Sequence, residues 1–427
     1  MLSPMSFTRR HVLGLSAGIA AAATLAACGS NTGRPNEGGG GGDGETPSLT
    51  QWYHEYGEDG VQDAVTRYAE EYPDATVEAV WQVGDYDKLV PAALLGQDAP
   101  DVFEFANGPS LDMIKAGQVV DLTDVVGDAR SDFPESILAP MVYEDKVWGI
   151  PQTVDMQMLY YRKSAVEAAG LAAPTTLAEL VEVSQAVAGN GGGFFAGNDG
   201  GLGVLGQVII WAAGYPLLND DLTDAGWNDP AFAEAVSAFR DFYNSSGYVK
   251  AASADWSSPA PFVNGECNLQ WTGLWNLPQI VEAHGDDVGV IPFPAIGGQG
   301  ETAVAIGAYS ACVSANRPNV EAAKDFVRWL WIDQADKQVE FSTAFGAHIP
   351  ARTSLAGEAE MLATGPGADA VEMVNQWGHG PDLFWSSPSS DAYSSALNNI
   401  VVRGADAASE IQTAASAVSA ELKRLNG

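Results

Sequence analysis

The sequence predicts an α/β protein with two lobes, in which helices cover both faces of open sheets. Segments with the two-residue period of strands alternate with segments that have the 3.6-residue period of helices, a pattern typical of α/β layering. The chain has 427 residues, of which 46% are hydrophobic and 18% are charged, so it is long enough for two packed cores and too apolar to be disordered.

Residues 1–27 have the pattern of an export signal. Arg9 and Arg10 precede an apolar stretch at residues 12–27, which is too short to span a membrane comfortably. The arginine pair resembles the twin-arginine export signal, and Leu25-Ala26-Ala27-Cys28 resembles the lipobox of bacterial lipoproteins. These resemblances imply cleavage before Cys28, a lipid on its sulfur, and a protein anchored at the extracellular face of the bacterial cell membrane.

Residues 28–45 are predicted to be the lipidated cysteine followed by a flexible tether. Glycines stand in a row at positions 38–42, and hydrophobic residues are almost absent. A Gly-rich coil of about 17 residues has an end-to-end distance of roughly 23 Å. We therefore expect the folded part of the chain to lie just off the membrane.

From residue 46 the first elements form a β-α-β unit. Residues 49–53 and 75–83 read as strands, and the helix between them has Val61, Ala64, Val65 and Tyr68 on one face. The elements predicted further along are helices at residues 86–95, 176–188, 231–245, 320–333 and 409–425, and strands at residues 100–105, 147–154, 158–161, 268–271, 288–291 and 309–313. The extended chain near residue 155 is predicted to be interrupted at Asp155.

Charge and motif content exclude several classes of function. Lysine and arginine number 20 against 55 aspartates and glutamates, and the resulting formal charge of −35 is opposite to what a nucleic-acid partner requires. The three cysteines form no CxxC pair, and the five histidines show no HxxxH or HExxH spacing. We therefore expect no metal, no cofactor and no nucleic acid.

Short motifs recur in a characteristic order between residues 46 and 427. They include Asp101-Val102, Asp121-Leu122-Thr123, Val147-Trp148-Gly149-Ile150-Pro151, Leu159-Tyr160-Tyr161-Arg162-Lys163, and Phe262-Val263-Asn264-Gly265-Glu266 before Gly273-Leu274-Trp275. In this order the motifs resemble family 1 extracellular solute-binding proteins, the maltose-binding-protein relatives of ABC importers.

The resemblance implies a two-lobed periplasmic-binding-protein-like fold of type II, with open sheets, helices on both faces and three hinge crossings. The predicted N-terminal lobe comprises residues 46–154 and 292–312, and the predicted C-terminal lobe comprises residues 155–291 and 313–427. The crossings are expected near residues 152–157, 291–293 and 313–315. The ligand would be clamped between the lobes of a monomer.

Candidate ligand-binding residues follow the carboxyl ends of predicted strands or carry aromatic rings. A sugar needs aromatic faces for its C–H surfaces and carboxylates or amides for its hydroxyls. By the resemblance, Asp155 and Trp275 stand where the family has a sugar-bonding acid and a stacking tryptophan. The other candidates are Tyr53, His54, Glu55, Glu104, Asn107, Trp211, Trp385 and Tyr393.

The resulting hypothesis is a substrate-binding lipoprotein that captures a sugar or oligosaccharide and delivers it to the membrane permease of an ABC importer. The chain carries no catalytic motif, so we expect no enzyme. A receptor of the same class for a polyol, a glycerol-phosphate ester or a polyamine is the alternative, and a glycoside hydrolase is a more remote one.

Two cysteines besides Cys28 need an explanation. Export makes a disulfide between Cys267 and Cys312 chemically possible. Such a bond next to a predicted hinge would oppose lobe motion, so two buried free thiols are favoured, although the sequence leaves pairing open.

Overall fold

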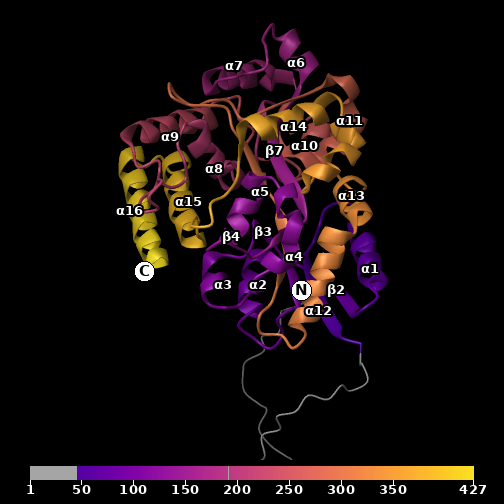
Figure 1. The fold of residues 1–427 in the computed structure, drawn as a ribbon. Helices are drawn as coiled ribbons and strands as arrows, with labels where there is room; N and C mark the ends of the chain where they lie inside the picture. Colours follow the sequence, from indigo (N-terminus) through magenta and orange to yellow (C-terminus); the bar gives the residue numbers. More distant parts are fainter. Residues whose placement is uncertain (1–45, 191) are drawn as a thin grey trace, which may run out of the picture. The chain divides into compact units, whose positions relative to one another are not determined.

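Two main β-sheets organise the chain from Thr46 to Gly427, which is one compact unit of the computed structural model (Figure 1). The structure describes residues 46–190 and 192–427. The predicted export signal, the tether and Cys28 therefore lie outside the described residues.

The first sheet has the strand order β2-β1-β3-β12-β6. Strand β1 pairs in parallel with both β2 and β3, and β12 pairs antiparallel with β3 and β6. Parallel neighbours need a crossover connection, which helix α1 (Val61–Glu71) supplies between β1 and β2. The strands are β1 (Ser48–His54), β2 (Thr76–Gln82), β3 (Val102–Ala106), β6 (Ile150–Pro151) and β12 (Tyr309–Val313).

The second sheet is centred on the ten-residue strand β7 (Thr153–Arg162). Strands β9, β10, β11 and β13 all pair antiparallel with β7, and β8 and β14 extend the sheet at its edges. The bounds are β8 (Phe194–Phe195), β9 (Leu269–Gly273), β10 (Val288–Ile291), β11 (Val304–Gly307), β13 (Ile349–Pro350) and β14 (Gly378–His379). A separate hairpin pairs β4 (Val142–Tyr143) with β5 (Lys146–Val147).

Helices cover the sheets and also pack on one another. In Figure 1, α15 and α16 (yellow) lie beside α8 and α9, and their apolar residues form a second core with the inner face of α7. The longer helices are α2 (Tyr86–Ala93), α7 (Leu177–Val187), α8 (Leu202–Ala212), α9 (Pro230–Tyr243), α11 (Leu277–His284), α12 (Val320–Arg328), α13 (Ala335–Thr343), α14 (Gly365–Trp377), α15 (Ser387–Val401) and α16 (Ala407–Asn426). The shorter ones are α3 (Leu111–Lys115), α4 (Thr123–Val126), α5 (Glu135–Leu138), α6 (Lys163–Ala168) and α10 (Ala260–Val263).

The predicted fold class is confirmed, and most predicted elements agree with the structure. Strands β10 and β12 have the predicted bounds, and the predicted apolar face of α1 is buried. The predicted interruption at Asp155 is wrong, because Asp155 lies within β7 and pairs with Gly307 of β11.

Strand pairing changes the predicted crossings. The chain passes from the first sheet to the second between β6 and β7, and it returns at Gly307 and Ala308, after β11 has paired with β7. It does not cross at residues 313–315, because α12 then packs against β12 and α4. Residues 304–307 and 320–328 therefore lie with the opposite sheet from the one that the predicted lobe boundaries imply.

The return crossing is held by Asn107, which follows β3. Its backbone N–H donates to Ala308 O at 2.7 Å, and its side-chain oxygen accepts from the N–H of Ala308 at 3.1 Å. Asn107 has a φ of 60°, a left-handed conformation that asparagine tolerates better than most residues. The end of β3 is thereby tied to the connection between the two sheets.

The two cysteines of the described region are buried free thiols, as favoured from the sequence. Burial raises the pKa of both thiols, that of Cys312 to about 12. Within residues 46–190 and 192–427, no helix is both long and apolar enough to cross a membrane.

Candidate functional site

The main cavity has a volume of about 1070 Å³ and is lined by residues from both sheets. Strands β1 and β3 are parallel, so their carboxyl ends meet at one edge, where ligands of open α/β sheets bind. The first-sheet side contributes the loop after β1, the end of β3 and the start of β12 through His54, Glu55, Tyr56, Glu58, Asn107 and Tyr309. The opposite side contributes Asp155 and Gln157 of β7, helix α8, and the residues around Trp256 and Trp275.

A buried carboxylate organises the first-sheet side of the cavity. Glu104 is 1% exposed and accepts hydrogen bonds from the His54 backbone N–H at 2.7 Å and the Tyr56 hydroxyl at 2.7 Å. Its Oε1 also lies 2.5 Å from His54 Nδ1. Burial by itself lowers the pKa of His54, but the hydrogen bond and charge of Glu104 outweigh it and raise the pKa. The ring of Tyr309 stacks on His54 with 4.3 Å between centroids, so the imidazole is fixed from two directions.

A second histidine sits between two acids. His348 is 6% exposed, and its Nδ1 contacts Asp155 while its Nε2 lies 3.2 Å from Glu58. Burial by itself would lower the pKa of His348, but the charges and hydrogen bonds of Asp155 and Glu58 raise it to about 10. Both ring nitrogens face carboxylates, so the imidazolium form donates to both and links the loop after β1 to β7.

Aromatic rings dominate the opposite side. The ring of Trp275 lies against Gly273, where an added Cβ would come within 2.0 Å of the indole, so only glycine fits under it. Trp275 Nε1 donates to Ser257 O at 3.1 Å, and Trp256 meets Trp275 edge-to-face with 5.8 Å between centroids. Trp275 is half-buried, so part of its ring is available to a ligand.

Helix α8 presents one face to the cavity and another to the core. Gly203, Val204, Gln207, Val208 and Trp211 line the cavity at the spacing of successive helical turns. The core face is formed by Leu202, Leu205, Ile209, Ile210 and Ala212. Val208 and Trp211 line the cavity but are also buried in this core, whereas Val204 and Gln207 reach the cavity with partly exposed side chains.

The structure brings seven of the ten predicted binding residues to the cavity wall. These are His54, Glu55, Asn107, Asp155, Trp211, Trp275 and Tyr393. Their binding roles stay predictions.

Three predicted residues, Tyr53, Glu104 and Trp385, do not line this cavity. Successive side chains of a strand point to opposite faces, so Tyr53 packs into the core against Trp81 when His54 faces the cavity. Glu104 acts through His54 and Tyr56, as described. Trp385 is 9% exposed and packs edge-to-face on Trp227, in the core beneath α15.

Several lining residues were absent from the predicted set. Tyr56 and Glu58 follow β1 directly, so the rule that selected Glu55 applies to them as well. Tyr309 begins β12, which is antiparallel, so its amino end reaches the edge where β3 ends. Trp256 lies far along the chain from these strands, and no local pattern marks it. His348 lies in the segment at residues 345–352, which resembles a recurring turn of the family, but it was not among the predicted binding residues.

None of the lining residues in the described region is a lysine or an arginine. The acids and histidines there are His54, Glu55, Glu58, Asp155 and His348. Recognition of a phosphate or carboxylate usually needs the charged forks of arginine or the ammonium of lysine. The cavity therefore suits a ligand without a strong negative charge.

A two-sheet α/β fold with a mixed aromatic and polar cavity between the sheets defines a protein that holds a small solute. The family described as bacterial extracellular solute-binding protein has a model that matches residues 46–331, more than half of the chain. The chain belongs to this family. Both the family and the fold are those of substrate-binding proteins.

The names and titles of similar proteins mention several different ligands. The sn-glycerol-3-phosphate-binding periplasmic protein UgpB of Yersinia pestis is 24% identical over 356 residues, which cover 76% of this chain and 80% of the relative. The galactooligosaccharide-binding protein of Bacillus subtilis is 23% identical over 327 residues, covering 74% of this chain and 75% of the relative. The GacH receptor of Streptomyces glaucescens, solved unliganded and with acarbose, has a TM-score of 0.74 and 20% identity, covering 89% of this chain and 98% of that one.

Proposed function

We propose that the protein is the substrate-binding component of an ABC importer, that it captures a sugar or oligosaccharide in the main cavity, and that it delivers the sugar to the membrane permease. The observation that carries the proposal is the composition of the cavity wall. Trp275, Trp256 and Tyr309 offer aromatic faces, and Asp155, Gln157 and Asn107 offer hydrogen-bonding groups.

The described cavity wall contains no lysine or arginine, which favours a sugar over a phosphate ester as the ligand. A glycerol-phosphate ligand, suggested by the Yersinia relative, would place its phosphate among Glu55, Glu58 and Asp155 without a cationic fork. The names of the galactooligosaccharide-binding and acarbose-binding relatives agree better with this lining.

The proposed function also includes a lipid anchor on Cys28, at the extracellular face of the membrane. The support is the lipobox-like sequence Leu25-Ala26-Ala27-Cys28 and the glycine-rich stretch after it. Two acyl chains give stable membrane retention, whereas one chain gives marginal retention. Cys28→Ala should therefore move the protein from the membrane fraction to the medium, and a variant that stays with the membrane would contradict the anchor.

A thermal-shift screen of mono-, di- and oligosaccharides tests the ligand class. A ligand at about 100 times its Kd adds about 2.7 kcal/mol to the free energy of unfolding, which is a clear rise in Tm. Glycerol 3-phosphate and spermidine belong in the same screen, because stabilisation by either one in place of every sugar would overturn the proposal. Analysis of the sugars after incubation would reveal cleavage products if the protein were a glycosidase.

A further inference from the structure

Of the three acids among the described residues that line the main cavity, two share one histidine. His348 Nδ1 contacts Oδ1 of Asp155, and its Nε2 lies 3.2 Å from Oε1 of Glu58. The third acid, Glu55, is exposed on the loop after β1. The acids that lie deepest in the wall are therefore the two that have a protein partner.

Strand register places His348 next to Asp155. Strands β13 and β7 are antiparallel with Ile349 opposite Val154, so the same register brings the residue before Ile349 opposite the residue after Val154. The backbone N–H of His348 also donates to Ser342 O of α13 at 3.0 Å. The imidazole is thus positioned by the backbone on both of its sides along the chain.

Close packing brings Glu58 to the other ring nitrogen. A Cβ added at Gly346 would lie 3.1 Å from His348 Nε2 and 3.2 Å from Glu58 Cγ, so the loop after β1 sits directly on this segment. His348 is 6% exposed, whereas the side chain of Asp155 keeps 25% of its surface accessible. A ligand can therefore reach Asp155 while the carboxylate is already in contact with the imidazole.

The two acids keep the ring of His348 protonated. Burial alone would lower its pKa, but the charges and hydrogen bonds of Asp155 and Glu58 raise the pKa to about 10, so the ring is an imidazolium at neutral pH. On the loop after β1, His54 is held by Glu104. Other charged residues of the elements around His348 have partners of their own, in the pairs Lys337–Glu71, Glu340–Arg67 and Arg352–Asp132.

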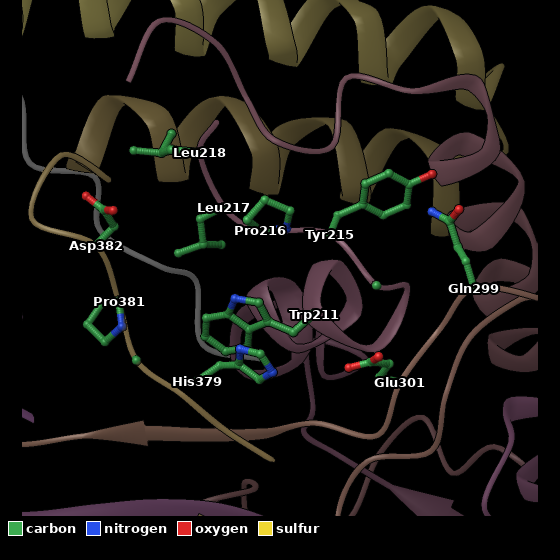
Figure 2. Close-up of a pocket in the computed structure, with 12 residues that line it drawn as sticks. Trp211, Tyr215, Pro216, Leu217, Leu218, Gln299, Glu301, His379, Pro381 and Asp382 are labelled. Carbon is green, nitrogen blue, oxygen red and sulfur yellow. The ribbon is translucent and has the colours of Figure 1, made fainter. Parts of the chain in front are cut away.

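A histidine elsewhere in the fold provides the contrasting case. His379 of β14 lines a smaller cavity, and Figure 2 shows its ring face to face with Trp211, with 5.2 Å between centroids. Burial lowers the pKa of His379, so its imidazole is neutral at physiological pH. The positive charge of His348 therefore follows from its position between two carboxylates.

We propose that His348 is a specificity-determining residue of the main cavity, whose imidazolium neutralises Asp155 and Glu58 and thereby excludes cationic solutes. This inference rests on the proposed function and narrows it to uncharged ligands, because the cavity wall already disfavours anions. Without the imidazolium, two carboxylates in a cavity lined by Trp256 and Trp275 would suit a quaternary ammonium ion, which binds through charge and cation–π contacts. With the imidazolium in place, a second cation beside Asp155 is repelled.

Choline and 3,3-dimethylbutan-1-ol test the inference on the whole chain, because the two molecules have the same shape and differ in positive charge. Ligand-observed NMR titrations at neutral pH measure both affinities. His348→Gln removes the charge and keeps a hydrogen-bond donor, so it should bind choline at least about tenfold more tightly than the wild type, with less than about a twofold change for the alcohol.

Two further variants separate charge from shape. His348→Lys keeps a positive charge at this position and should exclude choline as the wild type does. His284→Gln, at the end of α11 and away from the cavity wall, is the matched histidine-to-glutamine control and should behave like the wild type. Tm values report whether each variant is folded.

The pH dependence of choline binding gives a test on the wild type alone, which decides if His348→Gln fails to fold. A choline ion that binds beside the acids must displace the proton of His348, so its affinity should rise by about tenfold for each pH unit between about pH 7 and pH 9. Choline keeps its charge over this range, so the change reports the protein. A folded His348→Gln variant should lose most of this dependence, and the remainder would report His54.

Three results would overturn the inference while leaving the proposed function standing. The first is equal choline binding by the wild type and His348→Gln, which includes the case in which neither binds. The second is choline binding by His348→Lys as tight as that of His348→Gln, and the third is a wild-type choline affinity that does not change with pH. If spermidine stabilises the wild type and no sugar does, the proposed function itself fails, and the inference fails with it.

Discussion

The two sides of the main cavity are built in different ways. The first-sheet side consists of ionisable residues held in a network around the buried carboxylate of Glu104. The opposite side consists mainly of tryptophans and uncharged polar residues, with Asp155 of β7 as its acid and with Trp275 resting on Gly273. The shape of the first-sheet side therefore depends on hydrogen bonds and charges around Glu104. The opposite side offers aromatic rings whose exposed parts contribute little to the stability of the fold.

The largest effect is expected on the first-sheet side. Glu104→Ala removes the acceptor of three contacts and leaves the partly buried donors of His54 and Tyr56 without this partner, which should lower the free energy of unfolding by about 3 kcal/mol. Glu55→Ala, at an exposed neighbour of the same loop, should change it by less than about 0.5 kcal/mol. Chemical denaturation measures both, and equal effects would mean that Glu104 does not organise this side.

The next effect is expected on the aromatic side and concerns binding. Trp275→Ala should weaken sugar affinity by about 30-fold, or about 2 kcal/mol, because the ligand loses a stacking surface. Its unliganded Tm should fall less than that of a core variant, since Trp275 is only half-buried. Trp271→Ala is the matched control: Trp271 is buried in β9, so its loss should cost about 3 to 5 kcal/mol of stability. Calorimetry and thermal melts separate the two outcomes, and native affinity in Trp275→Ala would remove this residue from the site.

A smaller effect should appear as a pH dependence. The folded-state pKa of His348 is raised to about 10 by Asp155 and Glu58, above the ordinary value of 6.5. Because folding raises this pKa, protonated His348 stabilises the folded state fully below pH 6.5. This stabilisation is lost as the pH rises toward 10. We expect the free energy of unfolding to fall by at least about 1 kcal/mol between pH 7 and pH 9. His348→Gln should flatten this slope, and a slope equal to that of the wild type would assign the loss to other groups.

The smallest expected change is in overall size. If the two sides close on a sugar, small-angle scattering should show a slightly smaller radius of gyration at saturating ligand. A radius that does not change would mean that the ligand enters without closure. Trp275→Ala at the same sugar concentration serves as the control, because weaker binding should leave its radius nearer to the unliganded value.

Sequence periodicity predicted the fold class and most strand positions, because burial on one face leaves a clear signature. The helix α1 and strand β10 are examples. The crossings were less predictable. Residues 304–307 form a short strand whose sheet depends on pairing with β7, and pairing partners distant in sequence leave no local pattern.

The candidate site was predictable where residues directly follow a strand. His54 and Asn107 were found in this way, but the same rule selected Tyr53, whose side chain belongs to the opposite face of β1. A shift of one residue along a strand moves a side chain from the cavity face to the core face. The sequence does not mark where the strand ends, so it could not decide between Tyr53 and His54. His348 became part of the site through contacts with Asp155 and Glu58, which only the tertiary fold brings together.

The two faces of α8 have a consequence for evolution. Val204 and Gln207 reach the cavity while partly exposed, and buried neighbours such as Leu205 and Ile209 hold the helix in the core. Substitutions of Val204 and Gln207 change the surface that contacts a ligand and have little effect on the free energy of unfolding. After a gene duplication, the copies can diverge in ligand preference along this helix while they inherit an unchanged scaffold.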